Sequence, residues 1–106
     1  MNPSHANIEP HTGCISKALA VVGDKWSPLI LREIAEGTHR FSILARHLVG
    51  ISPRTLSQRL DHLEQAGILR KECFSEMPPR IEYTLTAKGA DLLPILRQMA
   101  KWGDKY

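Results

Sequence analysis

The chain is 106 residues long, with 42% hydrophobic and 24% charged residues, a composition that indicates one folded domain and excludes a disordered polymer. No apolar run approaches the roughly 20 residues of a membrane helix, and two cysteines are too few for a disulfide framework, so we expect a cytoplasmic protein. The net charge of +3 favours a polyanionic partner only weakly. Whether the protein binds a nucleic acid therefore has to be inferred from where the charged residues lie.

Residues 1–13 contain two prolines and several turn formers, which predicts a flexible N-terminal arm. We expect the folded domain to cover residues 14–106. Its first helix is predicted to open at Cys14 and to stop at Gly23, because apolar side chains recur there at helical spacing. These side chains are Ile15, Ala18, Leu19 and Val22.

Two further helices are predicted before the middle of the chain. The second covers residues 25–36 and has Asp24 as its capping residue. A short extended bridge at residues 38–41 follows. Ser42 is then predicted to cap a third helix that ends at His47.

The clearest helix is predicted over residues 53–66. Ser52 fits the N-cap, Pro53 fits the first helical position, and Gly67 fits the C-terminal stop. At about 100° per residue, three leucines fall on one side, which predicts a buried stripe. The leucines are Leu56, Leu60 and Leu63, and the residues broadly opposite are Arg54, Gln58, Asp61 and His62.

A β-hairpin is predicted next. Residues 69–75 and 80–85 are its strands, and residues 76–79 form a stiff turn whose two prolines exclude a central strand. The expected hairpin therefore spans about residues 69–85 and has a protruding tip.

A last helix is predicted over residues 87–106, capped by Thr86 and kinked by Pro94. It carries more apolar side chains than so small a core is expected to cover, which predicts a homodimer. The alternative is that this helix only closes its own domain. The candidate dimerisation residues on the first and last helices are Ile15, Leu19, Leu92, Ile95, Leu96, Met99 and Trp102.

The order of these elements predicts a mainly helical α+β fold, the winged helix-turn-helix, with dimerisation helices at both ends of the domain. In this plan the helix at residues 53–66 enters the DNA major groove. Arg54 is suited to guanine and Gln58 to adenine, and hydroxyl groups suit either a base or a phosphate. The acids at the far end of the helix would lie away from the phosphates. The alternative for this helix is an ordinary solvated surface.

The candidate DNA-binding residues fall into groups. Arg54, Gln58, Thr55 and Ser57 are predicted on the recognition helix, and Arg40, Lys71 and Ser52 are candidates for phosphate contacts. Arg80 at the hairpin tip is a candidate for the minor groove or a phosphate, or is an ordinary exposed arginine. Arg59 lies nearer the core edge and is equally suited to a neighbouring carboxylate.

Five sequence segments together resemble a known family. They are Gly-Asp-Lys-Trp-Ser-Pro-Leu-Ile-Leu-Arg-Glu (23–33), Arg-Phe-Ser-Ile-Leu (40–44), Gly-Ile-Ser-Pro-Arg-Thr-Leu-Ser-Gln-Arg-Leu (50–60), Leu-Glu-Gln-Ala-Gly-Ile-Leu (63–69) and Pro-Pro-Arg-Ile-Glu-Tyr-Thr-Leu-Thr-Ala-Lys-Gly (78–89). Over residues 14–106 the chain resembles the HxlR-type winged-helix regulators of bacteria, a branch related to the MarR-like fold. The resemblance implies a dimer whose first and last helices pack across a two-fold axis. It also implies that DNA is read by residues 53–66 and by a wing at residues 75–80.

The two cysteines carry separate expectations. Cys14 opens the first helix, where the helix dipole favours a thiolate, and several HxlR-type regulators look to sense oxidants or electrophiles with a cysteine at this position. The alternative for Cys14 is a small hydrophobic residue at the dimer edge. Cys73 stands where the family usually has an aliphatic residue, which predicts a core position.

Other chemistries find little support. The sequence contains no phosphate-binding glycine loop and no nucleophile signature, and its histidines match no zinc spacing, so we expect no enzyme, no metal and no cofactor. The expected partners are a double-stranded DNA operator with an inverted repeat and a second copy of the chain, with an oxidant or small molecule as effector. The competing hypothesis is a winged-helix module that binds proteins without sequence-specific DNA binding.

Overall fold

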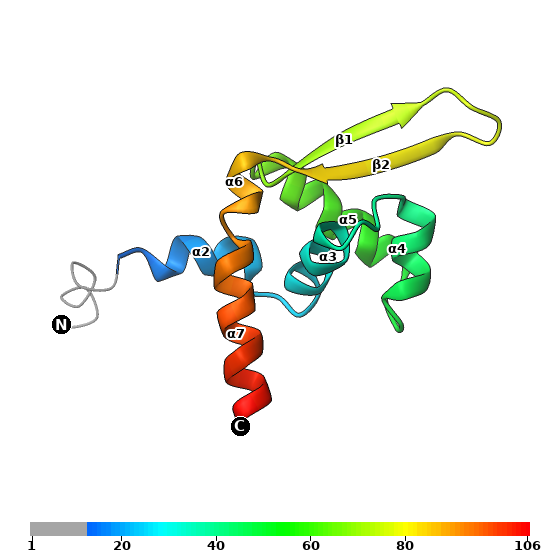
Figure 1. Ribbon diagram of the computed structural model, residues 1–106. Coiled ribbons are helices and arrows are strands. Elements are labelled where there is room, and N and C mark those ends of the chain that lie inside the picture. Colours follow the sequence, from blue (N-terminus) through cyan, green and yellow to red (C-terminus); the bar gives the residue numbers. More distant parts are fainter. Residues whose placement is uncertain (1–12) are drawn as a thin grey trace.

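The computed structural model describes residues 13–106, so all of the expected arm except Gly13 lies outside the described residues. Helices and a two-stranded hairpin follow one another in the predicted order (Figure 1). The elements are α2 (Ile15–Val22), α3 (Trp26–Ala35), α4 (Phe41–His47), α5 (Pro53–Gln65), β1 (Leu69–Phe74), β2 (Arg80–Leu85), α6 (Ala87–Ala90) and α7 (Leu93–Lys105).

The core lies where α3, α4 and α5 pack together beneath the base of the hairpin. Its side chains come from the helical apolar stripes, and the leucines of α5 are fully buried. Each buried aliphatic side chain contributes roughly 1.5–3 kcal/mol of transfer free energy, so this stripe fixes which side of α5 faces inward. The largest fully buried apolar side chains are Ile30, Leu31, Leu44, Leu56, Leu60, Leu63 and Ile68.

Side-chain caps set three of the helix starts as predicted. The Asp24 carboxylate accepts hydrogen bonds from the backbone N–H of Trp26 at 3.0 Å and of Ser27 at 2.9 Å. Ser52 accepts from the N–H of Thr55 at 3.0 Å, and Thr86 accepts from the N–H of Gly89 at 3.0 Å. Each cap satisfies a backbone donor that has no partner inside its helix.

The prediction that Ser42 caps the third helix is wrong. The helix starts at Phe41, two residues before the predicted first helical residue, and Arg40 is its N-cap, with the extended angles φ −85° and ψ 138°. The cause is the bridge before it: Arg40 pairs with Glu82 of the hairpin, and the N–H of Tyr83 donates to the carbonyl of His39 at 2.9 Å. This pairing holds the backbone extended through Arg40, so helical geometry begins immediately after it.

The single kinked C-terminal helix is also corrected. The chain forms the short α6, turns at residues 91–92 and starts α7 with Pro94 in its first turn. Proline has no N–H to donate to a carbonyl four residues earlier, and its ring clashes with that carbonyl. Pro94 therefore starts a new helix. From there α7 projects away from the body as a separate arm (Figure 1).

The hairpin β1–β2 is antiparallel, with Leu69 opposite Leu85 at its base and Phe74 opposite Arg80 at its far end. It extends beyond the helices (Figure 1). Cys73 pairs with Ile81 near the far end and is exposed, so the prediction of a core position is wrong. The helices cover the base of the ribbon and leave its outer half open to solvent.

The order of elements and the two-stranded wing confirm the predicted winged helix-turn-helix fold. Within residues 13–106 no helix is long and apolar enough to cross a membrane.

Candidate nucleic-acid interface

The outer side of α5 presents polar side chains to solvent. Arg54, Ser57 and Gln58 are exposed, whereas the three leucines of the same helix have no exposed surface. Among the described residues, none of these three polar side chains takes part in a side-chain hydrogen bond or an ion pair. Their donors and acceptors therefore remain available to an external partner.

The start of α5 is held by a pair of hydroxyl groups. Ser52 accepts a hydrogen bond from the N–H of Thr55, and its hydroxyl donates to Thr55 Oγ1 at 3.0 Å. The hydroxyl proton of Thr55 is left free to donate outward. Ser52 and Thr55, both predicted as DNA-binding residues, thus also fix the end of the helix on which Arg54 stands.

Two side chains of α5 turn toward other helices. Arg59 lies with Nη1 3.6 Å from Asp24 Oδ1, the carboxylate partner that the sequence left open as an alternative. His62 was placed with the outward polar residues, but it is half-buried and its Nε2 donates to the carbonyl of Ala20 at 2.9 Å. This bond satisfies a carbonyl in the last turn of α2 and ties α5 to α2.

Asp24 has an unusual electrostatic setting for a surface carboxylate. Burial alone would raise its pKa, but the Ser27 hydroxyl beside it, the two backbone N–H groups and the charge of Arg59 outweigh burial and lower the pKa below its ordinary value. The ionised form therefore dominates at neutral pH, which strengthens the cap of α3.

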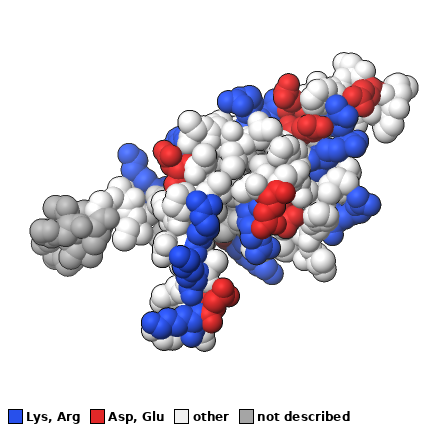
Figure 2. Space-filling view, viewed as in Figure 1, with Lys and Arg blue, Asp and Glu red and all other residues white. Residues whose placement is uncertain are grey.

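The hairpin holds Arg80 in a cluster with two carboxylates. Nη2 lies 3.0 Å from Glu76 Oε2, Nε lies 3.0 Å from Glu82 Oε2, and the guanidinium carbon lies 4.3 Å from the centre of the Phe74 ring. Arg80 therefore does not extend freely from the tip, as its predicted DNA contact would require. Figure 2 shows acidic and basic side chains close together over this part of the molecule.

A small hollow lies between the start of α4 and the hairpin. Its volume is about 160 Å³, and Arg40 and Ser42 face Arg80 and Pro79 across it. Sequence reasoning assigned Ser42 to a cap and so missed its place in this hollow. Its position two residues after Arg40 was the available signal. Lys71, the remaining phosphate candidate, is half-buried in β1.

The first and last helices present apolar side chains to solvent. Leu92 and Leu96 pack partly against the core, whereas the other candidate dimerisation residues stand in the open. The exposed stripe of α7 continues to Tyr106, whose ring centre lies 5.3 Å from that of Trp102. The exposed fractions are 52% for Ile15, 58% for Leu19, 52% for Ile95, 54% for Met99 and 69% for Trp102.

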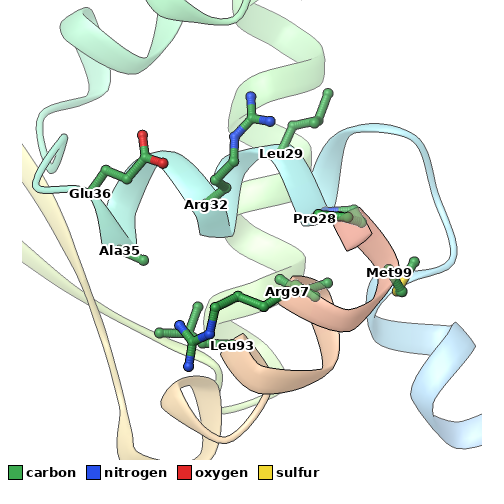
Figure 3. Close-up of a pocket in the computed structure, with 10 residues that line it drawn as sticks. Pro28, Leu29, Arg32, Ala35, Glu36, Leu93, Arg97 and Met99 are labelled. Carbon is green, nitrogen blue, oxygen red and sulfur yellow. The ribbon is translucent and has the colours of Figure 1, made fainter. Parts of the chain in front are cut away.

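An apolar groove of about 540 Å³ separates α3 from α7 (Figure 3). Ala35 and Pro28 line its α3 side, and Leu93 and Met99 line its α7 side. In Figure 3, Arg97 extends from α7 along the gap. The volume lies within the range of small-molecule sites, and the groove also adjoins the exposed stripe of α7.

Cys14 is exposed and stands as the N-cap residue of α2. Its side chain makes no capping hydrogen bond, although its carbonyl accepts from the N–H of Ala18 at 3.4 Å. The thiol is therefore open to reagents in solution.

Known proteins are similar to this chain both in sequence and in fold. The family model described as HxlR-like helix-turn-helix matches residues 21–106. An HTH-type transcriptional regulator of Methanothermobacter thermautotrophicus is 38% identical over 92 residues, which are 87% of this chain and 70% of that protein.

Comparison with solved structures leads to the same family of regulators. The redox regulator HypR in its oxidized form matches with a TM-score of 0.80 and 34% identity, covering 87% of this chain and 95% of that one. The reduced form of the transcriptional regulator YodB from B. subtilis matches with a TM-score of 0.75 and 30% identity, covering 89% and 92%. The chain belongs to the HxlR-like helix-turn-helix family and is a DNA-binding transcriptional regulator of MarR-like winged-helix fold, not an enzyme.

Proposed function

We propose that the protein is a sequence-specific regulator that binds an inverted-repeat operator as a homodimer, with α5 in the major groove. One observation carries the proposal: Arg54, Ser57 and Gln58 lie exposed and unengaged on the side of α5 opposite its buried leucines. Arginine and glutamine are the side chains best suited to reading guanine and adenine in the major groove. A protein with this task works where the chromosome is, which in a bacterial or archaeal cell is the cytoplasm.

The rest of the interface follows from the docking of α5. The start of α5 contains Ser52 and Thr55, and the hollow beside the hairpin is lined by Arg40; both places are suited to phosphate contacts. Lys71 and Arg59 lie at the edge of the proposed DNA interface. The wing then approaches the adjacent minor groove.

The exposed apolar faces of α2 and α7 support the homodimer. Side chains such as Ile95, Met99 and Trp102 are more than half exposed in the single chain, and burial against a second copy removes them from water. Two-fold symmetry would set the two α5 helices about 34 Å apart, one turn of DNA, which requires an inverted repeat.

A titration of labelled duplexes tests the DNA proposal. The wild-type protein is used to enrich duplexes from a random-sequence pool, and the binding of the best duplex and of its scrambled form is followed by fluorescence anisotropy at several salt concentrations. We expect an inverted repeat, tight binding that salt weakens steeply, and roughly a thousandfold weaker binding of the scrambled duplex, at the lower edge of the usual roughly 10³–10⁷ ratio. Equal weak binding to all duplexes would favour the protein-interaction module instead.

We further propose that Cys14 makes operator binding responsive to oxidants or electrophiles. The support is its exposed thiol at the start of α2, together with the description of the similar HypR as a redox regulator. Mild oxidant should change the operator affinity of the parent protein and leave that of Cys14→Ser unchanged. The same response in both proteins would exclude Cys14 as the sensor, and Cys73→Ser is the matched control because Cys73 is exposed as well.

A further inference from the structure

The guanidinium of Arg80 is already occupied inside the wing. Two carboxylates lie 3.0 Å from its nitrogens, and the Phe74 ring covers one of its faces. Only 27% of the Arg80 side chain is exposed. An arginine that reads a narrow minor groove has to extend its guanidinium from the protein, and this one would first have to leave both partners.

Arg80 also offsets an excess of negative charge on its side of the hairpin. Glu72 and Glu82 are directly opposite each other across the strands, and like charges in that arrangement destabilise a hairpin. Glu76 adds a third carboxylate from the loop. With Arg80 removed, three acids would outnumber Arg70, the cation that the register places on the same face, and this part of the wing would repel the phosphates on both sides of a DNA groove.

The loop that joins the two strands of the wing, residues 75–79, contains three apolar residues. Met77, Pro78 and Pro79 are exposed, and Met77 has 96% of its surface open to solvent. Methionine and proline are among the side chains that proteins insert as wedges between base steps in the minor groove. The two prolines fix their φ angles, so the tip loses little conformational entropy on binding.

We propose that the wing contacts the minor groove through the apolar tip formed by Met77, Pro78 and Pro79, and that Arg80 makes no DNA contact. Arg80 is instead a positioning residue that neutralises Glu76 and Glu82 and so allows the tip to approach the phosphates. The proposal rests on the proposed function, because it assigns the roles within the same DNA interface.

A double-mutant cycle separates the two roles of Arg80. Its probe is the fluorescein-labelled duplex that the wild-type protein enriches most strongly from a random pool. The cycle compares the wild-type protein, Arg80→Gln, Glu76→Gln/Glu82→Gln and the triple variant. Arg80→Gln should weaken binding about tenfold when both glutamates are present, and less than about twofold when both are glutamine. Arg80→Lys keeps the positive charge and should stay within about threefold of the wild-type protein.

A direct contact between Arg80 and the DNA would give a different result. A direct phosphate contact would cost the same in both backgrounds, and the slope of log affinity against log salt concentration would fall by about 1 on removing Arg80 even without the two carboxylates. Either outcome overturns the role assigned to Arg80. The double-mutant cycle also distinguishes neutralisation from a general loss of wing structure, since an unfolded wing would not be rescued by removing carboxylates.

A second measurement tests the apolar tip. Met77→Ser should weaken binding about fivefold and should remove the hydroxyl-radical protection of the sugars beneath the wing, whereas Met77→Leu should retain both. Wild-type affinity and an unchanged footprint in Met77→Ser would overturn the assignment of the tip. If Arg54→Ala loses operator binding while both wing tests fail, only the wing proposal is wrong. A wild-type protein that prefers no duplex would instead refute the proposed function, and the wing proposal with it.

Discussion

The guanidinium of Arg59 lies 3.6 Å from the carboxylate of Asp24, the residue that caps α3. A side chain of the proposed recognition helix therefore holds the cap of the helix packed against it. Two backbone N–H groups and one guanidinium converge on a single carboxylate, and His62 makes a second link from α5 to the carbonyl of Ala20. The orientation of α5 is thus fixed by polar contacts at its rim as well as by its buried leucines.

Asp24 should contribute stability that depends on pH. We expect Asp24→Asn to lower the free energy of unfolding at pH 7 by about 0.5–1 kcal/mol, because asparagine keeps a capping oxygen but loses the charge that the start of α3 and Arg59 stabilise. Because the pKa of Asp24 is lower in the folded protein than its ordinary value of 3.8, its contribution is present above pH 3.8 and is lost as the pH falls through the folded pKa. Urea unfolding of both proteins at pH 7 and in a series below pH 4 measures the difference.

Asp104→Asn is the matched control for this effect, because Asp104 is an exposed acid of α7 and takes part in none of the ion pairs among the described residues. Its stability should stay within about 0.5 kcal/mol of the parent at each pH. A gap between Asp24→Asn and the parent that stays constant below pH 4 would show that the carboxylate charge plays no part.

Tyr83 should make the stability of the folded protein depend on pH in the alkaline range. Burial, followed by the nearby charges of Asp61, Glu64 and Cys73, raises its pKa from 10.0 to about 12. Since the folded state disfavours the phenolate, the stability due to neutral Tyr83 is complete below pH 10 and is lost as the pH rises through about 12.

Tyrosinate absorbance measures this directly, because the chain has only two tyrosines. In Tyr106→Phe the remaining signal belongs to Tyr83 and should reach its midpoint near pH 12, or earlier only where circular dichroism shows that the protein unfolds. A midpoint near 10 in the folded protein would mean that the phenol is hydrated. Tyr83→Phe should lose the decrease in stability that the parent shows above pH 10.

The helical part of the fold was predictable because local signals and packing agree there. The Ser52-Pro53 start, the leucine stripe and Gly67 give the limits of α5 to within a residue, and the structure adds the buried environment that the stripe requires. The same holds for Asp24 at the start of α3. In these places one stretch of sequence contains both the cap and the apolar period.

The wrong predictions occur where contacts between residues far apart in the sequence determine where an element begins or whether a side chain is buried. Ser42 looks like a cap, but the pairing of Arg40 with Glu82, which the local sequence does not contain, moves the start of α4. Cys73 occupies an apolar position of a strand, yet its end of the ribbon extends past the helices. The predicted DNA contact of Arg80 is a different case. Its two carboxylate partners, Glu76 and Glu82, lie within four residues of it along the chain, and the folding of the wing brings them to its guanidinium.

Arg54 should determine the identity of one base. Arg54→Ala should weaken binding of the selected operator by about 1–3 kcal/mol, and the loss should vanish when the base pair that Arg54 reads is already changed. Anisotropy titrations of a set of operators, each with one substituted base pair, locate that position. Arg97→Ala is the matched control, because Arg97 is exposed on α7, far along the chain from α5. A uniform loss over all operators would reassign Arg54 to a phosphate.

A charge placed on the exposed stripe of α7 should separate the dimer. Met99 is 54% exposed in the single chain, and in the proposed dimer Met99→Glu would bury an unpaired carboxylate. We expect the association to weaken by at least about 2 kcal/mol, or roughly 30-fold, and sedimentation equilibrium to shift from two chains toward one at micromolar concentration.

Lys101→Glu adds an acid on the same helix, at a residue outside the exposed apolar stripe, and should leave the dimer intact. Operator affinity should fall with the dimer in Met99→Glu, because a single chain reads only one half-site. A wild-type protein that sediments as one chain at every concentration, or a Met99→Glu variant as strongly associated as Lys101→Glu, would show that this stripe does not form the interface.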